Sequence, residues 1–515
     1  MLMEYIMVSL AVLAMGFIGW FGTAQLLMKY RKIENHMAFS FGILIFIVSW
    51  LVYGLILFFA KVFYPVTILL PMAGLLPFAI KFLKNISKEN RVVVYVFLLQ
   101  FSIGILLQLF LPYYPIGSDW FRHYQASEKY LAGDFATAYG RTPMFNILSA
   151  MFLEVLSNHF WVYQASSVFL NSLLIVPLYL IAKDFNKRYA FLTILFVALN
   201  SFVLQNTVYT WPRNFSIFFI FFSYYFVIKN RMTLSSFTSA AAFFAHVSTM
   251  FSIIPVYIYG YMAKRKNILK SVLLIGILLL PIMVYYAINT GTQESPDTPS
   301  SFFLYPFAVN GYESTINRSA GAVFSDFLSK PFYYIVEIRI IDFIMTTTPS
   351  LLVLKLVSLF TTIPIIQIQK TVVVSEIPMI YHWLLSFPGA LSSIVYAFSL
   401  IGLYKMFHKD RKFFWLLVMP MILGLLYWGW IKAGIVNDLL PASVPLLIMV
   451  GVSQMKSKKW IYLSLLVMIV EGIIFWYFYI NTIPSFIQNI PTRVPPVADA
   501  TEMLSVDSIS RVLFG

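Results

Sequence analysis

The sequence contains no cysteine and few charged residues for its length. None of its 515 residues is Cys, which excludes disulfides, thiolate metal sites and cysteine catalysis. Asp, Glu, Lys and Arg make up only 11% of the chain, whereas soluble domains carry about 25%. The chain is therefore not a soluble globular protein, and its hydrophobicity also excludes a disordered one.

Hydrophobic and aromatic residues are abundant instead. Hydrophobic residues make up 60% of the chain and aromatic residues 18%, and the mean hydropathy is +0.81. Apolar helices cross the bilayer, and aromatic rings gather at its two interfaces. The composition predicts a membrane protein.

Apolar runs recur along the whole chain, and a helix needs about 20 such residues to cross the bilayer. We expect an all-α polytopic membrane protein with roughly 11–14 transmembrane helices. The candidate spans are residues 4–28, 37–60, 62–80, 92–112, 161–182, 189–205, 215–228, 233–245, 247–262, 268–288, 388–404, 413–430, 439–454 and 460–480.

Acidic residues are scarcer than basic ones, 21 against 36, so the net charge is +15. Most of the basic residues fall in seven clusters separated by even numbers of candidate spans, so the positive-inside rule puts all seven in the cytoplasm. There they face anionic lipid, and we expect no nucleic-acid partner. The clusters are Lys29/Arg31/Lys32, Lys81/Lys84/Lys88/Arg91, Lys183/Lys187/Arg188, Lys229/Arg231, Lys264/Arg265/Lys266, Lys405/Lys409/Arg411/Lys412 and Lys456/Lys458/Lys459.

This topology requires that residues 143–157 do not cross the membrane, and we expect an amphipathic helix lying in the outer interface there. Two long loops then face outward, and we expect interfacial helices in both of them. The predicted parts are N-terminal transmembrane helices (1–112), a first outer loop (113–160), central transmembrane helices (161–289), a second outer loop (290–387), C-terminal transmembrane helices (388–480) and an outer tail (481–515).

The first outer loop is the richest in chemical groups, with the stretch GSDWFRHYQASEKYLAGDFATAYGRTP at residues 117–143. If residues 118–131 are helical, Asp119, Arg122 and His123 share one side of the helix. Asp119 beside the bilayer is a candidate general base. Arg122, His123 and Arg141 are candidates for binding a substrate phosphate, and Tyr124 is a further candidate for substrate binding. The alternative is an ordinary solvated loop that begins with a helix cap.

A second polar stretch, QNTVYTWPRN at residues 205–214, joins two candidate spans on the same outer face. Trp211 and Arg213 are candidates for the wall of an outer cleft that binds the substrate. The alternative for Trp211 is a place in the aromatic belt of the membrane interface.

Two further candidates lie at the ends of candidate spans. His246 lies between two short spans, where an ionisable residue suggests function. Alternatively, His246 is a neutral structural residue, with Ser248 and Thr249 satisfying the backbone at a helix break. Lys432, in the outer turn IKAGIVNDLLP, is a candidate for binding an anion, whereas Asp438 in the same turn is also suited to cap a helix.

The layout resembles the GT-C glycosyltransferases, the class of protein mannosyltransferases and lipid-A aminoarabinose transferases. The hallmark is an acidic residue in the first outer loop directly after a span, which is Asp119 here. A difference is the outer stretch 205–214, where the family often has Asp and this chain has Trp211-Pro-Arg213. The stretches that carry the resemblance are GSDWFRHYQ, RTPMFNILSAMFLEVLSNHF, NSLLIVPLYLIAKDFNKRYAFLTILFVALNSF, VYTWPRNFSIFFIFFSYYF and NDLLPASVPLLIMVGV.

The resemblance implies transfer of a sugar from a polyprenyl-phosphate-linked donor, such as a dolichol phosphate, to an acceptor lipid, glycan or protein, with inversion. Asp119 would deprotonate the acceptor hydroxyl. The lipid phosphate would leave against positive charge from Arg122, Arg141, Arg213 or Lys432. Members that use a monophosphate donor generally need no metal, whereas members that use a pyrophosphate donor can use a divalent cation.

The location that this implies is the cell membrane, with the site on the outer face, or the endoplasmic reticulum membrane if the host is eukaryotic. Other interpretations stay open. A polysaccharide polymerase or ligase also carries a large outer loop with Arg or His residues. A lipid-linked glycan flippase suits the number of spans, although the chain shows no internal repeat and few charges inside its spans. A membrane protein without catalysis is a further alternative.

Overall fold

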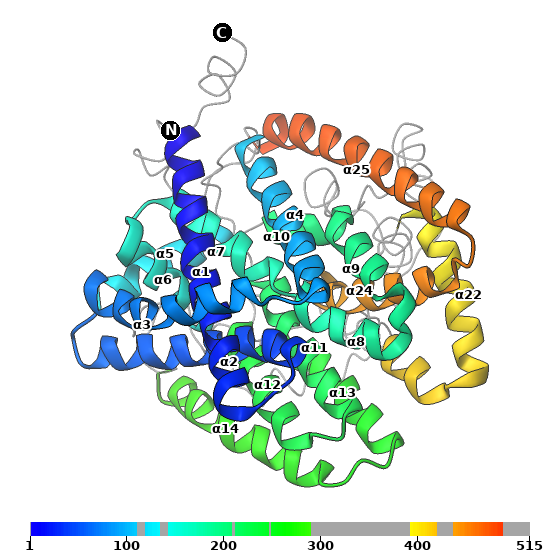
Figure 1. Cartoon of the computed structure of the whole chain (residues 1–515), viewed down its shortest axis with the longest axis horizontal. Coiled ribbons are helices and arrows are strands. Elements are labelled where there is room, and N and C mark those ends of the chain that lie inside the picture. The colour runs from blue at the N-terminus through cyan, green and yellow to red at the C-terminus, as the bar shows by residue number, and fades with distance from the viewer. Residues whose placement is uncertain are drawn as a thin grey trace, which may run out of the picture.

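The computed structural model describes residues 2–110, 119–133, 143–208, 212–246, 249–289, 392–419 and 436–487, and their secondary structure is helical (Figure 1). The helices are α1 (Leu2–Arg31), α2 (Asn35–Phe59), α3 (Pro65–Lys84), α4 (Lys88–Phe110), α5 (Asp119–Leu131), α6 (Pro143–Leu156), α7 (Phe160–Ser172), α8 (Ile175–Asn186), the 3-10 helix η1 (Lys187–Tyr189), α9 (Ala190–Leu199), α10 (Ser201–Val208), α11 (Arg213–Ile228), α12 (Met232–Ala245), α13 (Met250–Met262), α14 (Ile268–Asn289), α22 (Ser393–Lys409), α24 (Val436–Gln454) and α25 (Lys458–Ile487).

Five helical stretches in the described residues are long and apolar enough to cross a membrane. They are α1, α2, α3, α4 and the nearly continuous helical stretch Phe160–Leu199. The predicted all-α, membrane-embedded class is therefore confirmed, while the number of crossings stays a prediction. The second outer loop, 290–387, lies outside the described residues, and α25 continues to Ile487, beyond the predicted end of its span at residue 480.

Two predicted spans are each divided into two helices. The span 161–182 is interrupted between α7 and α8 at Leu173 and Leu174, because Pro177 lacks an N–H and its ring clashes with the carbonyl four residues before it. The span 189–205 is interrupted at Asn200, whose Oδ1 accepts the N–H of Val203 at 3.1 Å and so caps α10. Each break brings polar backbone into an otherwise apolar layer.

The first four helices pack around aromatic side chains of α1. Trp20 is fully buried, with its ring centroid 4.6 Å from that of Phe39, and its Nε1 donates to the Phe39 carbonyl at 2.7 Å. Phe21 stacks on Phe82 of α3 at 5.5 Å. Figure 1 shows α1 and α4 running through this part of the molecule.

Small residues let other helices approach closely. A Cβ on Gly42 of α2 would lie 2.8 Å from the Cβ of Ala24 and 2.9 Å from its backbone. The α11–α12 seam is instead lined with hydroxyl groups, and Ser223 Oγ lies 2.7 Å from Oγ of both Ser235 and Ser239. Both kinds of seam are typical of helices packed in a bilayer.

The helix expected to lie in the outer interface is enclosed by protein. All ten residues of α6 from Met144 to Leu153 are buried. Phe152 makes an edge contact with Trp50 of α2 at 4.9 Å, and Met151 lies against Gly54. The sequence of α6 explains the difference, because its apolar residues surround the helix and such a helix is normally buried.

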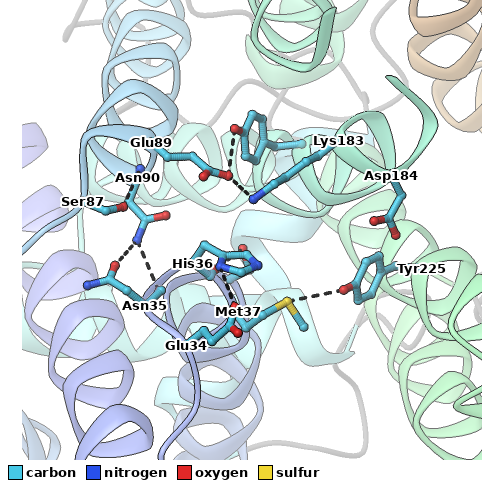
Figure 2. A network of polar contacts seen from close by, with 12 residues as sticks. Glu34, Asn35, His36, Met37, Ser87, Glu89, Asn90, Lys183, Asp184 and Tyr225 are labelled. Atoms are coloured by element: carbon cyan, nitrogen blue, oxygen red, sulfur yellow. Dashed lines mark hydrogen bonds and ion pairs between the residues drawn. The ribbon is translucent and has the colours of Figure 1, made fainter. Parts of the chain in front are cut away.

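The starts of α2 and α4 meet α8 at one end of the molecule, shown in Figure 2. Asn90 donates to the backbone carbonyl and side-chain oxygen of Asn35. Glu89 Oε1 accepts from Tyr179 Oη at 3.0 Å and pairs with Lys183 Nζ. These contacts bring the first three basic clusters together.

The fourth and fifth clusters join the same end. Lys229 at the end of α11 pairs with Asp184 of α8 at 2.9 Å. Arg265 Nη2 donates to the carbonyl of Ile228 at 2.7 Å. Loops after α11 and α13 therefore lie beside the end of α8.

The last two clusters complete this arrangement. Phe413, next to Lys412, stacks on Phe185 of α8 at 5.4 Å between ring centroids. Lys405 Nζ donates to Gln454 Oε1, at the end of α24, at 2.9 Å. All seven basic clusters thus gather at one end of the molecule, called the basic end below.

The opposite end is defined by the start of α1, the end of α4 and the end of α10. Tyr5 Oη donates to Gln108 Oε1, and Gln108 Nε2 donates to the carbonyl of Val208 at 3.0 Å. Since α1 and α4 begin or end at the basic end, each runs the full distance between the two ends.

Candidate functional site

The predicted site residues fall into three groups: outside the described residues, described by backbone position alone, or described with their side chains. Arg141, Trp211 and Lys432 lie outside the described residues. Asp119 and Arg122 are placed as backbone positions in α5. The described side chains are those of His123, Tyr124, Arg213 and His246.

The helix predicted after the fourth span is α5, and it begins at Asp119. His123, Ala126 and Tyr130 follow at steps of three and four along α5, and all three are buried. The helical position of Asp119 is one turn before His123, on the same face. The buried part of α5 packs against α6, where Tyr130 joins Ile147 and Ala150 in a hydrophobic cluster.

Tyr124 ties α5 to the start of α7. Its ring meets Phe160 edge-on at 5.2 Å, and its hydroxyl lies 3.4 Å from the carbonyl and side-chain oxygens of Asn158. Asn158 Nδ2 in turn donates to Glu128 Oε1 at 3.2 Å. Because α7 and α8 lead from here to Lys183, this contact lies at the end opposite the basic end.

Buried amide groups hold the start of α11 in place. Asn171 Oδ1 of α7 accepts the N–H of Phe215 at 2.9 Å. Asn214 Nδ2 donates to Thr207 Oγ1 at 2.9 Å, and Gln100 Nε2 of α4 donates to the same hydroxyl at 3.0 Å. The first turn of α11 is therefore bound to α7 and α10, and α4 holds the same hydroxyl of α10.

Arg213 is the first residue of α11 and is half-buried. Its Nη1 lies 3.5 Å from Asn206 Oδ1 of α10. A helix N-terminus is positively polarised, and the guanidinium adds a full charge there. This arrangement favours an anion at the start of α11.

A row of aromatic rings connects α5 with α11. Tyr124 lies 5.7 Å from Tyr163, Tyr163 lies 6.2 Å from Phe145, and Phe145 lies 5.7 Å from Phe215. Phe215 is two residues after Arg213. The first and second predicted outer segments, which are far apart in sequence, are thus packed at the same end.

His246 ends α12, and its carbonyl accepts both the N–H of Thr249 at 3.1 Å and the Thr249 hydroxyl at 2.7 Å. Thr249 therefore satisfies the backbone at this helix break, as one interpretation of the sequence predicts. Because α11 and α12 are antiparallel through Ser223 and Ser235, His246 lies toward the same end as Arg213. Its imidazole is half-buried.

Several polar residues that organise this region are absent from the sequence-based set. They are the amides Gln100, Asn171 and Asn214, each at most 1% exposed, and the hydroxyl of Thr207. The signal in the sequence is an amide inside an apolar run, since buried polar groups are normally hydrogen-bonded. Their partners come from distant helices and cannot be read from spacing.

The described residues contain no group of three or more His, Asp or Glu side chains able to hold a metal ion. Comparisons with protein-family models, with curated proteins and with solved structures give no match for this chain. The arrangement itself consists of a helix that begins with an acid, α5, and a helix that begins with a base, α11, linked by aromatic packing.

Proposed function

We propose that this protein is a membrane glycosyltransferase of the GT-C type, which moves a sugar from a polyprenyl-phosphate-linked donor to an acceptor hydroxyl. Asp119 is the general base. Arg213 contacts the donor phosphate. Arg122, Arg141, Trp211 and Lys432 are further candidates for contacting the substrate.

One observation carries the proposal. Helix α5, which begins at Asp119, and helix α11, which begins at Arg213, are linked by aromatic rings of α6 and α7 at the end opposite the basic end. A carboxylate and a positive helix start at the same end of the molecule are the two groups that the reaction requires. Orientation of the basic end toward the cytoplasm, as the positive-inside rule predicts, puts them on the outer face.

The proposed chemistry needs only one proton transfer. The acceptor hydroxyl gives its proton to the Asp119 carboxylate while its oxygen bonds to the anomeric carbon. The anomeric carbon–oxygen bond to phosphate breaks on the opposite face of the sugar. Its electron pair leaves with the lipid phosphate, whose added negative charge is stabilised at the start of α11.

The test is transfer by the purified full-length protein from a panel of radiolabelled polyprenyl-phosphate sugars to acceptor or water. Wild type should release sugar, and Asp119→Asn should lose at least about 100-fold in rate, as expected for loss of a general base. Glu128→Gln is the matched control, because it lies on the same helix and keeps an oxygen that accepts from Asn158.

Two outcomes contradict the proposal. One is the absence of turnover with every donor by a folded wild-type protein. The other is equal turnover by wild type and Asp119→Asn. A parallel reaction with a chelator decides whether a divalent cation takes part, since loss of turnover that added Mg²⁺ or Mn²⁺ restores would assign one.

A further inference from the structure

One lysine lies far from the basic end, in the turn between α2 and α3. Helix α2 begins at the basic end with Asn35 and ends at Phe59, at the opposite end of the molecule. Lys61 follows in the turn and is exposed. Every other Lys and Arg in residues 2–110 belongs to the first two basic clusters. The positive-inside rule therefore accounts for those cations but not for Lys61.

The backbone at Lys61 also disfavours a side chain. Its φ is 57°, in the left-handed region that glycine adopts freely and other residues avoid. Its N–H donates to the carbonyl of Phe58, and the N–H of Val62 donates to the carbonyl of Leu57, each at 2.9 Å. Glycine is the usual residue at such a helix end. Because neither the topology nor the turn favours lysine here, we expect its side chain to have a use.

The side chains around Lys61 are apolar and exposed. Phe59 is 72% exposed, Tyr64 57% and Val66 77%. None of the ion pairs within the described part of the chain involves Lys61. A cation beside exposed apolar side chains, at the ends of two spans, is suited to the headgroup layer of a bilayer, where lipid phosphates lie next to the hydrocarbon.

This turn is packed against the helix that carries the proposed general base. Phe63 lies against the cluster that Tyr130 of α5 forms with Ile147 and Ala150 of α6. The turn and α5 therefore lie at the same end of the molecule. Lys61 precedes every stretch that carries the GT-C resemblance, so its role is not carried over from that family.

We propose that the α2–α3 turn binds the phosphate of an isoprenoid monophosphate lipid, with Lys61 as the cation and the exposed apolar side chains against the start of the isoprenoid chain. The inference rests on the proposed function, whose lipid product is this compound. A phosphate monoester carries about −1.5 to −2 charges at pH 7, whereas the phosphodiesters of the sugar donor and of bilayer lipids carry one. A lysine without an acidic partner therefore favours the released lipid.

The experiment measures binding rather than turnover. Full-length protein in phosphatidylcholine nanodiscs is titrated with radiolabelled polyprenyl monophosphate. The unlabelled competitors are polyprenol of the same chain length and phosphatidylglycerol. Wild type should bind the monophosphate saturably, and each competitor should be at least about tenfold weaker, because it lacks the phosphate or carries less charge.

The conformation of Lys61 supplies a variant that should fold. Lys61→Gly removes the cation at a position that glycine favours, so the thermal unfolding midpoint should not fall. Binding should weaken at least about tenfold, as expected for the loss of a hydrogen bond between charged groups. Lys61→Arg should stay within about threefold of wild type, since the charge is kept. Lys84→Ala, an equally exposed lysine at the other end of α3, is the control and should bind like wild type.

Three outcomes would overturn the site. They are the absence of saturable binding by wild type, equal binding by Lys61→Gly, and equal competition by phosphatidylglycerol, which would make Lys61 a general contact for anionic lipid. Failure of the proposed function gives a different result. Binding that depends on Lys61 without sugar transfer would reject the transferase and keep the site, whereas sugar transfer with unchanged binding in Lys61→Gly would reject the site alone.

Discussion

At the scale of single residues, a few buried amides position helices inside the apolar interior of this protein. Asn171 lies on α7 in an apolar setting, yet its oxygen accepts the N–H of Phe215. That N–H belongs to the first turn of α11, which has no partner within its own helix. One side chain thus both satisfies a helix end and sets the position of Arg213.

Replacing this amide should be costly. We expect Asn171→Ala to destabilise the protein by about 1–3 kcal/mol, because the buried N–H of Phe215 is left without an acceptor. The neighbouring change Ser172→Ala should have a much smaller effect. The measurement is thermal unfolding of both variants in detergent, and equal midpoints would show that Asn171 does not hold α11.

Residues of α5 show what spacing alone predicts. The spacing of Asp119, Arg122 and His123 predicts one helix, and α5 is that helix. Spacing does not predict that His123 is only 2% exposed, because its burial depends on α6 packing against it. The roles of Asp119 and Arg122 in substrate binding and catalysis stay predictions.

At the scale of elements, the seams between helices decide how the assembly packs. At the α1–α2 seam, Gly42 has space for a hydrogen atom but not for a side chain, because the backbone of Ala24 lies against it. Backbone atoms cannot rotate out of the way as a side chain can. A methyl group at Gly74 or Gly276, by contrast, would meet no atom within 4 Å.

This difference gives a sharp comparison between glycines. Gly42→Leu should force α1 and α2 apart and greatly reduce the yield of monodisperse protein, since overpacking a close seam costs about 1–3 kcal/mol or more. Gly276→Leu should behave like wild type. Size-exclusion chromatography of the detergent-solubilised variants measures this, and similar profiles for both would contradict the packing of α1 on α2.

The helix α6 shows the limit of interpretation by element. Its shortness and its leading Pro143 predict a helix that does not cross the membrane. Its polar residues Asn146, Ser149 and Glu154 favoured an interfacial position, but the first two are fully buried. Whether a short apolar helix lies on a surface or inside a bundle depends on its neighbours, which the local sequence does not contain.

At the scale of the whole molecule, the basic clusters of the described residues define an axis between two ends. Contacts from α2 through α24 gather all seven basic clusters at the basic end, and α5 lies at the opposite end. The sequence predicts a common side for these clusters through the even number of spans between them. The contacts in the structure agree with that grouping.

The orientation of this axis can be tested because the chain has no cysteine of its own. We expect a membrane-impermeant maleimide to label Gln125→Cys, on the exposed side of α5, in right-side-out vesicles. Lys187→Cys, at the basic end, should be labelled only after permeabilisation. The parent chain provides the unlabelled control, and labelling of both variants from the same side would contradict the two-ended arrangement.

The sequence by itself determined the class of this protein and the approximate positions of many of the helices that the structure describes. Apolar runs, scarce charge and spaced basic clusters are local properties, and the bilayer acts on each of them directly. Pro177 and Asn200 likewise carry enough local chemistry to account for the helix breaks once these are seen.

The tertiary structure alone decided which distant groups meet. It linked α5 to the start of α11 through aromatic rings of α6 and α7, enclosed α6, tied Glu89 to Lys183, and brought Ser201 against Gly472. The physical reason is that apolar helices in lipid have many neighbours of similar hydrophobicity to choose from. Close-packed small residues and a few buried polar groups select among them, and both act only across the seams between helices.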